Sequence, residues 1–509
     1  MDYQAILLAL LPDLVVVVAL FAALGVDYGY LRGASLDKRA GTVMQICSVG
    51  LMGALVLLVL QLAGSLPLNY WELQKATDGQ LVLNPGTLVL KALLFAMGLA
   101  VLPLAGRHMV TPQVSEYFAL LLLATLGMGF MVSSRNLLGA FVALELVSLS
   151  LYALTALHQT RRASAEAALK YMTYGGVSSA FLLFGLSFLF GIMTMGAGKE
   201  FSLFITGNSI HPEALVTAPT LVTVAYLFIL VGLGFKIALA PFHLWAPDVY
   251  QSAPTPVAAW IASGSKIAGV VLLLTLLAPM SMPSAHTAIV PLLAAMAVVS
   301  MTVGNLGALR QSNLKRLLAY SAIANAGYLL VAVVAFTEDG RAAAVFYSVV
   351  YAIATLGAFA VVAVLSDSLG REAEIDDFRG CWKSHPCLSI ALLVFILSLA
   401  GIPPLAGFVG KFYLFFTAIQ AKSEIGYWSE GLYWLVAIGL GFSVVALYYY
   451  LKVLKAVFVS EETGPIGKEP IGWPSAAVIL LLSVLTLALG IWPGPFIDFI
   501  RVCVPDWLA

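Results

Sequence analysis

The sequence predicts an all-α protein that crosses a membrane many times. Of its 509 residues, 61% are hydrophobic and only 10% are charged, whereas soluble domains carry about 25% charged residues. The mean hydropathy is +0.98. So few charges cannot cover a surface that faces water, which excludes a soluble enzyme. The 26 basic residues balance the 26 acidic ones, and this neutral balance argues against nucleic-acid binding.

Fourteen stretches are long and apolar enough to span a bilayer, which takes about 20 residues. The first has an acid at Asp2 and neither a basic region nor a cleavage site, so we expect a span and not a signal peptide. SSRN at 133–136 is the only separator between the fourth and fifth stretches. The expected spans are 5–26, 41–63, 86–104, 115–132, 136–157, 165–192, 219–242, 254–278, 286–307, 314–336, 341–366, 387–419, 431–457 and 473–494.

These spans are expected to form one transmembrane domain over residues 1–509. Helices 1–3 occupy 1–104, and helix 14 occupies 473–494. Between them lie two blocks of five spans, 115–278 and 286–457. Because five is odd, the second block inserts upside down relative to the first, so we expect two inverted repeats, helices 4–8 and 9–13.

The basic residues outside the spans predict the orientation. Alternate loops, beginning with 27–40, carry 15 of the 26 basic residues, and the opposite loops and termini carry 6. Basic residues gather in the loops that stay inside the cell. We therefore expect an even number of spans and both termini outside.

The remaining five basic residues lie inside spans, and all are lysines. They are Lys91, Lys170, Lys236, Lys266 and Lys411. A charge at the bilayer centre costs at least about 2.5–3.5 kcal/mol, so it needs a partner, a wet cavity or a function. Glu145 is interpreted as the one acid deep in a span, and a partner for it must come from another helix.

Structural interpretations differ among these residues. Lys91 opens its span, so we expect its ammonium to reach the interface. Lys170 follows Glu166 by four residues, which allows a local ion pair. For Glu145 and the other lysines, a purely structural buried ion pair is the alternative to a functional one.

Prolines beside two of the lysines predict interrupted helices. Pro241 follows Lys236 in the seventh span, and Pro403 and Pro404 precede Lys411 in the twelfth. Proline removes a backbone donor, and in a bilayer such a break persists only where protein or water bonds the freed groups. Breaks at the same place in two halves point to an ion path. We therefore expect helices 7 and 12 to be discontinuous.

Buried lysines are suited to proton transfer. Burial favours the neutral form of a lysine and a nearby carboxylate favours the charged form, whereas arginine stays charged. His243, beside a broken helix, is either a proton relay or a histidine bonded by the backbone. The cysteines show no metal-ligand spacing and no histidine pair suggests haem, so we expect this chain to bind no metal and no cofactor.

Several long segments resemble a known family. They are EYFALLLLATLGMGFMVSSRNLLGAFVALELVSLSLYAL, EAALKYMTYGGVSSAFLLFG, GFKIALAPFHLWAPDVYQSAPTPV, SNLKRLLAYSAIANAGYLL and AGIPPLAGFVGKFYLF. Together they resemble the antiporter-like membrane subunits of respiratory complex I, the NADH:quinone oxidoreductase. The similarity is strongest to subunit N, the counterpart of mitochondrial subunit 2.

The resemblance implies a fold and a setting. Such subunits are similar in having fourteen helices with inverted repeats at 4–8 and 9–13, and they are taken to move protons. The resemblance implies that NADH, FMN, iron–sulfur clusters and quinone bind to other subunits. It also implies M-type and K-type membrane neighbours, and a place in the bacterial inner membrane with periplasmic termini.

The resemblance also assigns roles to residues. Glu145 matches the fifth-helix glutamate and Lys236 the seventh-helix lysine paired with it. Lys266 and Lys411 match lysines of the eighth and twelfth helices on the polar axis, and Lys170 matches a sixth-helix lysine. Lysine at 411 and the absence of a lateral helix after the fourteenth span fit subunit N better than its sisters M and L.

Two segments depart from the family pattern. Asn325 stands in SAIANAGY, where relatives often have a polar-axis histidine, and asparagine cannot titrate. The usual EGAPTP reads QSAPTP, with Gln251 and Ser252, which we expect to change the loop and not the lysine chemistry.

The leading hypothesis is a proton-translocating subunit of a membrane NADH:quinone oxidoreductase. Two alternatives remain open: an Mrp-type cation/proton antiporter that exchanges sodium, and a non-pumping membrane scaffold. The scaffold hypothesis predicts that lysine substitutions change assembly but not pumping.

Overall fold

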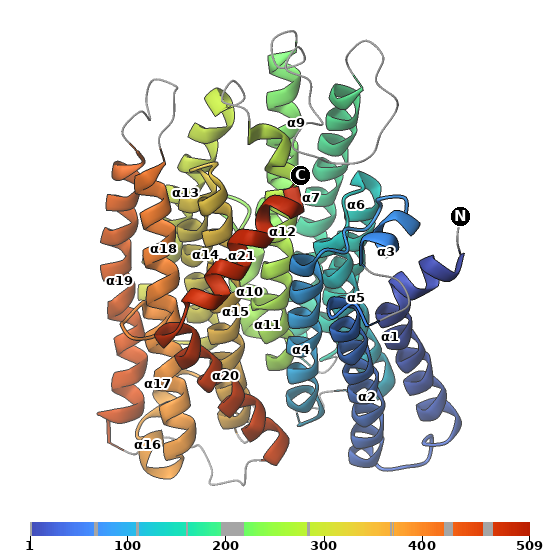
Figure 1. Ribbon diagram of the computed structural model, residues 1–509. Coiled ribbons are helices and arrows are strands. Elements are labelled where there is room, and N and C mark those ends of the chain that lie inside the picture. Colours follow the sequence, from blue (N-terminus) through green and yellow to red (C-terminus); the bar gives the residue numbers. More distant parts are fainter. Residues whose placement is uncertain are drawn as a thin grey trace. The chain divides into compact units, whose positions relative to one another are not determined.

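The protein is described here by a computed structural model (Figure 1). The described residues are 3–65, 70–107, 111–158, 161–194, 218–281, 286–366, 369, 371–421, 431–461 and 472–508. Within these ranges the chain is helical, and its only β-type pairings are two isolated bridges. The predicted all-α class is therefore confirmed.

Thirteen helices in the described part of the chain are long and apolar enough to cross a membrane. Each coincides with a predicted span. They are α1 (Tyr3–Gly29), α2 (Leu36–Leu62), α4 (Pro85–Arg107), α5 (Val114–Ser133), α6 (Leu137–Ala156), α7 (Arg162–Met193), α9 (Pro219–Lys236), α11 (Thr255–Ala262) with α12 (Gly264–Leu277), α13 (His286–Leu309), α14 (Leu314–Val333), α15 (Glu338–Ser366), α19 (Tyr433–Phe458) and α20 (Trp473–Ile491).

The predicted twelfth span consists of two shorter helices, α17 (Pro386–Ala400) and α18 (Ala406–Gln420). Neither helix alone is long enough to be counted as a membrane-spanning helix, and this accounts for the difference between fourteen predicted spans and thirteen long helices. The seventh span is interrupted as well, because α9 ends at Lys236 and the short α10 (Trp245–Ser252) follows. The predicted discontinuity of helices 7 and 12 is therefore confirmed.

The weak separator between the fourth and fifth predicted spans is a real helix boundary. α5 ends at Ser133, and Asn136 caps the start of α6. The Asn136 side-chain oxygen accepts hydrogen bonds from the backbone N–H groups of Leu138 (2.9 Å) and Gly139 (3.1 Å). This cap satisfies two of the donors that every helix start leaves unbonded.

The chain separates into two compact units. The first comprises residues 1–233, 271–280 and 502–509, and the second comprises 234–270 and 281–501. In the first unit, α1, α2, α4, α5, α6 and α7 pack as successive neighbours (Figure 1).

The second unit is organised around α15. This helix packs against α11, α14, α17, α18 and α20, and its spanning segment is buried on all sides. A helix that is apolar all round belongs in a core. Figure 1 shows α20 inclined relative to its neighbours α17 and α18. The core of this unit holds most of the candidate site.

The orientation and the inverted relation of 115–278 and 286–457 stay predictions. Lys199, Lys422 and Lys468, which entered the count of basic residues, lie outside the described residues.

Candidate proton-transfer site

The break after Lys236 is held by side chains from neighbouring segments. Lys236 is buried at the last position of α9. Beyond it, the indole N–H of Trp245 donates to the carbonyl of Phe235 at 3.1 Å, and the backbone N–H of Ala240 donates to the hydroxyl of Ser300 at 2.9 Å. The bond from Ala240 occupies a backbone N–H that the interruption sets free, as a membrane interior requires, and the indole adds a second donor to the Phe235 carbonyl, which also accepts from the backbone N–H of Ala238 at 3.1 Å.

The break in the twelfth span is held by a lysine. The Lys411 ammonium donates to the carbonyls of Leu399 (3.1 Å) and Ala400 (3.3 Å), which end α17. Carbonyls at a helix C-terminus lack helical partners and favour a cation. Gly401 follows with φ +84°, and a Cβ there would lie 3.0 Å from Lys411 Cδ. A side chain at this left-handed position would strain the backbone and press on the lysine stem, so glycine is favoured here.

A third interruption, which sequence reasoning missed, lies just before Lys266. Ser263 separates α11 from α12, and its backbone is not helical. At Gly264 an added Cβ would lie 2.4 Å from the ring of Trp260, so any larger residue here would force that ring to move. We expected a continuous eighth helix, because no proline marks the break. Ser263, Gly264 and Ser265 directly precede Lys266, and small residues of this kind are a much weaker sign of a break than a proline.

Lys266 is buried in α12 and has neutral partners. Its ammonium donates to the carbonyl of Ala322 at 2.7 Å and lies 5.3 Å from the ring centre of Tyr351. Beside it a cavity leaves about 20 Å³ for water, enough for about one molecule. Tyr351 also lines this cavity, whose wall is otherwise mostly apolar.

The cavity is lined by Lys266, and neighbours of two other predicted lysines lie around it. Its lining is Ile237, Lys266, Val270, Asn325, Ala326, Leu329, Tyr347, Ser348 and Tyr351. Ile237 follows Lys236, and an added Cβ at Gly269 of α12 would lie 3.4 Å from Lys236 Cγ. At Gly410, next to Lys411, an added Cβ would lie 2.7 Å from the Tyr347 ring. Tyr347 therefore touches both the Lys266 cavity and the start of α18.

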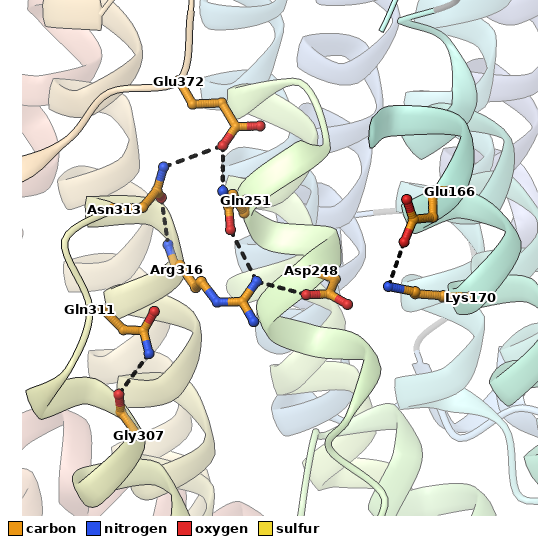
Figure 2. A network of polar contacts seen from close by, with 9 residues as sticks. All are labelled: Glu166, Lys170, Asp248, Gln251, Gly307, Gln311, Asn313, Arg316 and Glu372. Carbon is orange, nitrogen blue, oxygen red and sulfur yellow. Dashed lines mark hydrogen bonds and ion pairs between the residues drawn. The ribbon is translucent and has the colours of Figure 1, made fainter. Parts of the chain in front are cut away.

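The other two predicted residues belong to the first unit. Glu145 is half-buried in α6 and accepts a hydrogen bond from Ser179 of α7. Lys170 pairs with Glu166 at 2.8 Å, with 40% and 61% of the two side chains exposed (Figure 2). The local pair that the spacing allowed is therefore present. The pairing of Glu145 with Lys236 stays a prediction.

The supporting residues lie at the breaks. Pro241 and the pair Pro403 and Pro404 stand in the non-helical segments, each with a cis peptide bond before a proline. His243 is half-buried between α9 and α10, and its Nδ1 is buried without a hydrogen-bond partner among the described residues. Its proposed relay role stays a prediction. Within the described ranges, no three His, Cys, Asp or Glu side chains lie close enough to hold a metal ion.

A buried ion pair corrects two expectations. Lys91 does not reach the interface: its side chain is 2% exposed, and its ammonium lies 2.5 Å from the carboxylate of Asp13 in α1. Glu145 is therefore not the one acid deep in a span. The signal was available, since Asp13 follows Pro12 inside an apolar stretch. Buried cations pair with buried anions because either alone is costly.

The helix that carries Asp13 is itself perturbed. Pro12 has no N–H to offer to the carbonyl of Leu8. The side-chain amide of Gln61, from α2, donates to the carbonyls of Leu8 (3.0 Å) and Ala9 (3.3 Å) in its place. The ion pair thus stands beside a proline whose freed carbonyl is bonded by a neighbouring helix.

Gln251, one of the two departures in QSAPTP, joins a polar network at the end of α10 (Figure 2). Its amide N–H donates to Glu372 at 2.6 Å, and its amide oxygen accepts from Arg316 at 3.0 Å. Arg316 also pairs with Asp248 at 2.7 Å. A glutamine can serve both neighbours because it donates and accepts. Gln251 lies in the last turn of α10 and not in a loop, and it connects this helix to α14 and to the segment before η4 (Ile375–Phe378).

The Asp13–Lys91 pair predicts a non-additive mutant cycle. Asp13→Asn or Lys91→Met alone leaves a buried charge unpaired, which costs about 3–5 kcal/mol. Combining the two should recover much of the lost stability. The measurement is the thermal midpoint of the purified protein in detergent.

The control for this cycle is Lys170→Met. Its exposed pair contributes under about 1 kcal/mol, so the midpoint should hardly move. Additive losses in the double variant would contradict the interpretation.

The Gln251 network predicts a second rescue. Gln251→Glu removes a donor to a charged group, a loss of about 1.5–3 kcal/mol, and sets two carboxylates against each other. Glu372→Gln in the same chain should restore most of the stability, measured by the same thermal midpoint. Equal thermal midpoints for wild type and Gln251→Glu would show that the hydrogen bonds from Gln251 to Glu372 and Arg316 do not stabilise the protein.

Comparisons with known proteins agree with this geometry. A family model described as NADH:quinone oxidoreductase/Mrp antiporter, TM matches residues 134–436. NADH-quinone oxidoreductase subunit N 2 of Acidobacterium capsulatum is 41% identical over 98% of this chain and 99% of its own length.

Solved structures share the fold. A chain of respiratory complex I from Thermus thermophilus has a TM-score of 0.75 and 34% identity, over 96% of this chain and 98% of that one. A chain of the Mrp complex from a Dietzia species has a TM-score of 0.73 over 99% and 98%, and at 21% identity it shows the fold alone. The chain belongs to the NADH:quinone oxidoreductase/Mrp antiporter family of membrane subunits and, within it, to the subunit N group.

Proposed function

We propose that this chain is a proton-translocating subunit of a membrane NADH:quinone oxidoreductase. The observation that carries the proposal is the kind of partner that its buried lysines have. Lys266 and Lys411 donate to main-chain carbonyls, which are neutral. Loss of a proton from either amine therefore leaves no unpaired carboxylate, and both protonation states are accessible.

Lys91 shows the opposite arrangement in the same chain. Its partner is the Asp13 carboxylate, so neutralising Lys91 would leave a buried anion, at a cost of about 3–5 kcal/mol. A lysine held in this way stays charged. The contrast separates a structural lysine from lysines suited to exchange protons.

In the proposed path, Glu145 tunes the charge of Lys236. A proton then passes from Lys236 to water beside Lys266 and on to Lys411, which exchanges it with the other half of the chain. Lys170, on α7, is a further proton-transfer residue of this path, and His243 would relay protons at the break in the seventh helix. Each transfer breaks one N–H or O–H bond and forms another.

The wider setting is part of the proposal. NADH, FMN, iron–sulfur clusters and quinone would bind to other subunits, and quinone reduction there would drive the cycle. M-type and K-type subunits would be the membrane neighbours. The chain would lie in the bacterial inner membrane with periplasmic termini. The names of relatives at 36–41% identity support this setting over an Mrp-type antiporter.

The test uses Lys236→Ala and Glu145→Gln in the assembled complex, in closed membrane vesicles. Removing a positioned proton-transfer group slows its step by about 10²–10⁴-fold. The number of protons moved per NADH oxidised should therefore fall while the complex still assembles. A pH-sensitive dye and the absorbance of NADH give both quantities.

Lys383→Ala is the matched control, because this lysine is exposed outside the spanning helices. It should leave pumping unchanged. Unaltered pumping in Lys236→Ala, with electron transfer also unaltered, would exclude the proposed path and favour the scaffold alternative.

A further inference from the structure

The helices α13 and α19 lie side by side in the second unit and run in the same direction. A Cβ added at Gly439 of α19 would lie 3.7 Å from the sulfur of Met301 in α13. Further along both helices, the Tyr449 hydroxyl donates to the Asn305 side chain at 3.2 Å. Residue numbers rise together along these contacts, so α13 and α19 end on the same side of the unit.

Basic side chains gather where the two helices end. The Lys452 ammonium donates to the carbonyl of Gln311, two residues beyond α13, at 3.1 Å. Gln311 directly follows Arg310, so this bond brings Lys452 to the end of α13 that Arg310 occupies. Lys455 stands one turn further along α19, and all three basic residues are exposed. We call Arg310, Lys452 and Lys455 the basic end.

The positive charge of the basic end is not balanced by acids among the described residues. Neither α13 nor α19 contains an acidic residue. The neighbouring η4 contacts α19, but its acids pair elsewhere, Asp376 with Arg379 and Asp377 with Arg371. Glu461, three residues beyond α19, makes no ion pair with the basic end. An ammonium that donates one bond keeps two N–H groups for a ligand.

Next to the basic end, each helix exposes an apolar face. On α13, Val299 and Leu306 are 44% and 52% exposed, and on α19, Val444 and Tyr448 are 72% and 66% exposed. Spacings of four and seven residues put these side chains on the same helix faces as the basic residues. We call these four residues the apolar faces.

The apolar faces have the length of one lipid leaflet. Val299 lies eleven residues before Arg310, and Val444 lies eleven before Lys455. Eleven helical residues extend about 16 Å, and half of a bilayer core is about 15 Å. The ring of Trp382, 41% exposed, packs on the last aromatic ring of α19 with centres 5.5 Å apart. Tryptophan is enriched at the membrane–water interface, so the basic end lies at headgroup level.

We propose that α13 and α19 bind an anionic phospholipid across their exposed faces. The lipid phosphate accepts hydrogen bonds from the basic end, and the acyl chains lie along the apolar faces. Basic residues at the ends of membrane helices recognise anionic headgroups in this way. An acidic protein segment matches the charge alone, whereas a lipid matches the charge and the apolar length. Lipid binding here is independent of proton transfer, so it holds whether or not the lysine path does.

The test measures the thermal midpoint of the full chain, purified in a neutral detergent, as lipid is added. Dioleoylphosphatidylglycerol, which is anionic, should raise the midpoint. Dioleoylphosphatidylcholine, which has the same chains and no net charge, should not, and neither should inorganic phosphate, which has no chains. Equal effects of the two lipids, or of phosphatidylglycerol and inorganic phosphate, would overturn the proposal.

Two substitutions localise the headgroup. Each basic residue near an anionic lipid headgroup strengthens binding about fivefold, so Arg310→Gln with Lys452→Gln should weaken phosphatidylglycerol binding about 25-fold. The affinity follows from the midpoint as a function of lipid concentration. Lys38→Gln is the matched control, because Lys38 is an exposed basic residue at the start of α2, beside Asp37. Wild-type affinity in the double variant would exclude the basic end as the headgroup site.

A photoreactive lipid tests the site in the assembled complex without any substitution. Phosphatidylglycerol with a diazirine at the end of an acyl chain should label peptides near Val299 or Val444, identified by mass spectrometry. A diazirine on the headgroup should label peptides near Arg310 or Lys455, and labelling confined to other helices would contradict the site. A carbodiimide crosslink from Lys452 or Lys455 to a carboxylate of another subunit would show that a protein covers the basic end, and the lipid proposal would be wrong.

Discussion

A helix that is interrupted inside a membrane must find partners within the protein for the backbone groups that it no longer bonds. The Lys411 ammonium meets this requirement by donating to the last carbonyls of α17. The same contact places a titratable amine in the core of the second unit. Structure and chemistry are thus linked at one point: the break needs a donor, and the donor is a group that can lose a proton.

The chain holds its buried lysines in two ways. Lys91 is fixed by the Asp13 carboxylate, which suits packing of the first helices. Lys266 and Lys411 are bonded by carbonyls and lie beside the rings of Tyr351 and Tyr328. Neutral partners stabilise a cation without requiring it, so in the proposed function these two lysines are the ones suited to exchange protons. Burial alone therefore does not separate the two kinds of lysine, whereas the charge of the partner does.

The sequence allowed the spans and two of the three interruptions to be predicted. A long apolar run in a bilayer forms a helix because its backbone groups must bond to each other, and a proline interrupts that helix because it has no backbone N–H to donate. The break at Ser263 was missed because serine and glycine are tolerated in membrane helices and carry no such signature. Lys91 was misplaced because its depth depends on a partner on α1, 78 residues away, which spacing within one helix cannot reveal.

The tyrosines around Asn325 were hidden for a related reason. In the sequence of a span, a tyrosine cannot be told from the other large, mostly apolar residues. Only the packing of α14, α15 and α19 shows that the hydroxyls of Tyr347 and Tyr450 both hydrogen-bond to the side-chain amide of Asn325. Asn325 itself was recognisable as a non-titrating residue in the expected path. The structure adds its hydrogen-bond partners, Tyr347, Ser321 and Tyr450.

The central claim is that the lysines at the breaks act by losing and regaining a proton. Lys411→Arg tests it most directly, because guanidinium keeps the charge and the donors but does not deprotonate. The measurement is the number of protons moved per NADH oxidised by the assembled complex. We predict that assembly and electron transfer persist while pumping by this subunit is lost. A wild-type proton ratio in Lys411→Arg would contradict the claim, since charge alone would then suffice.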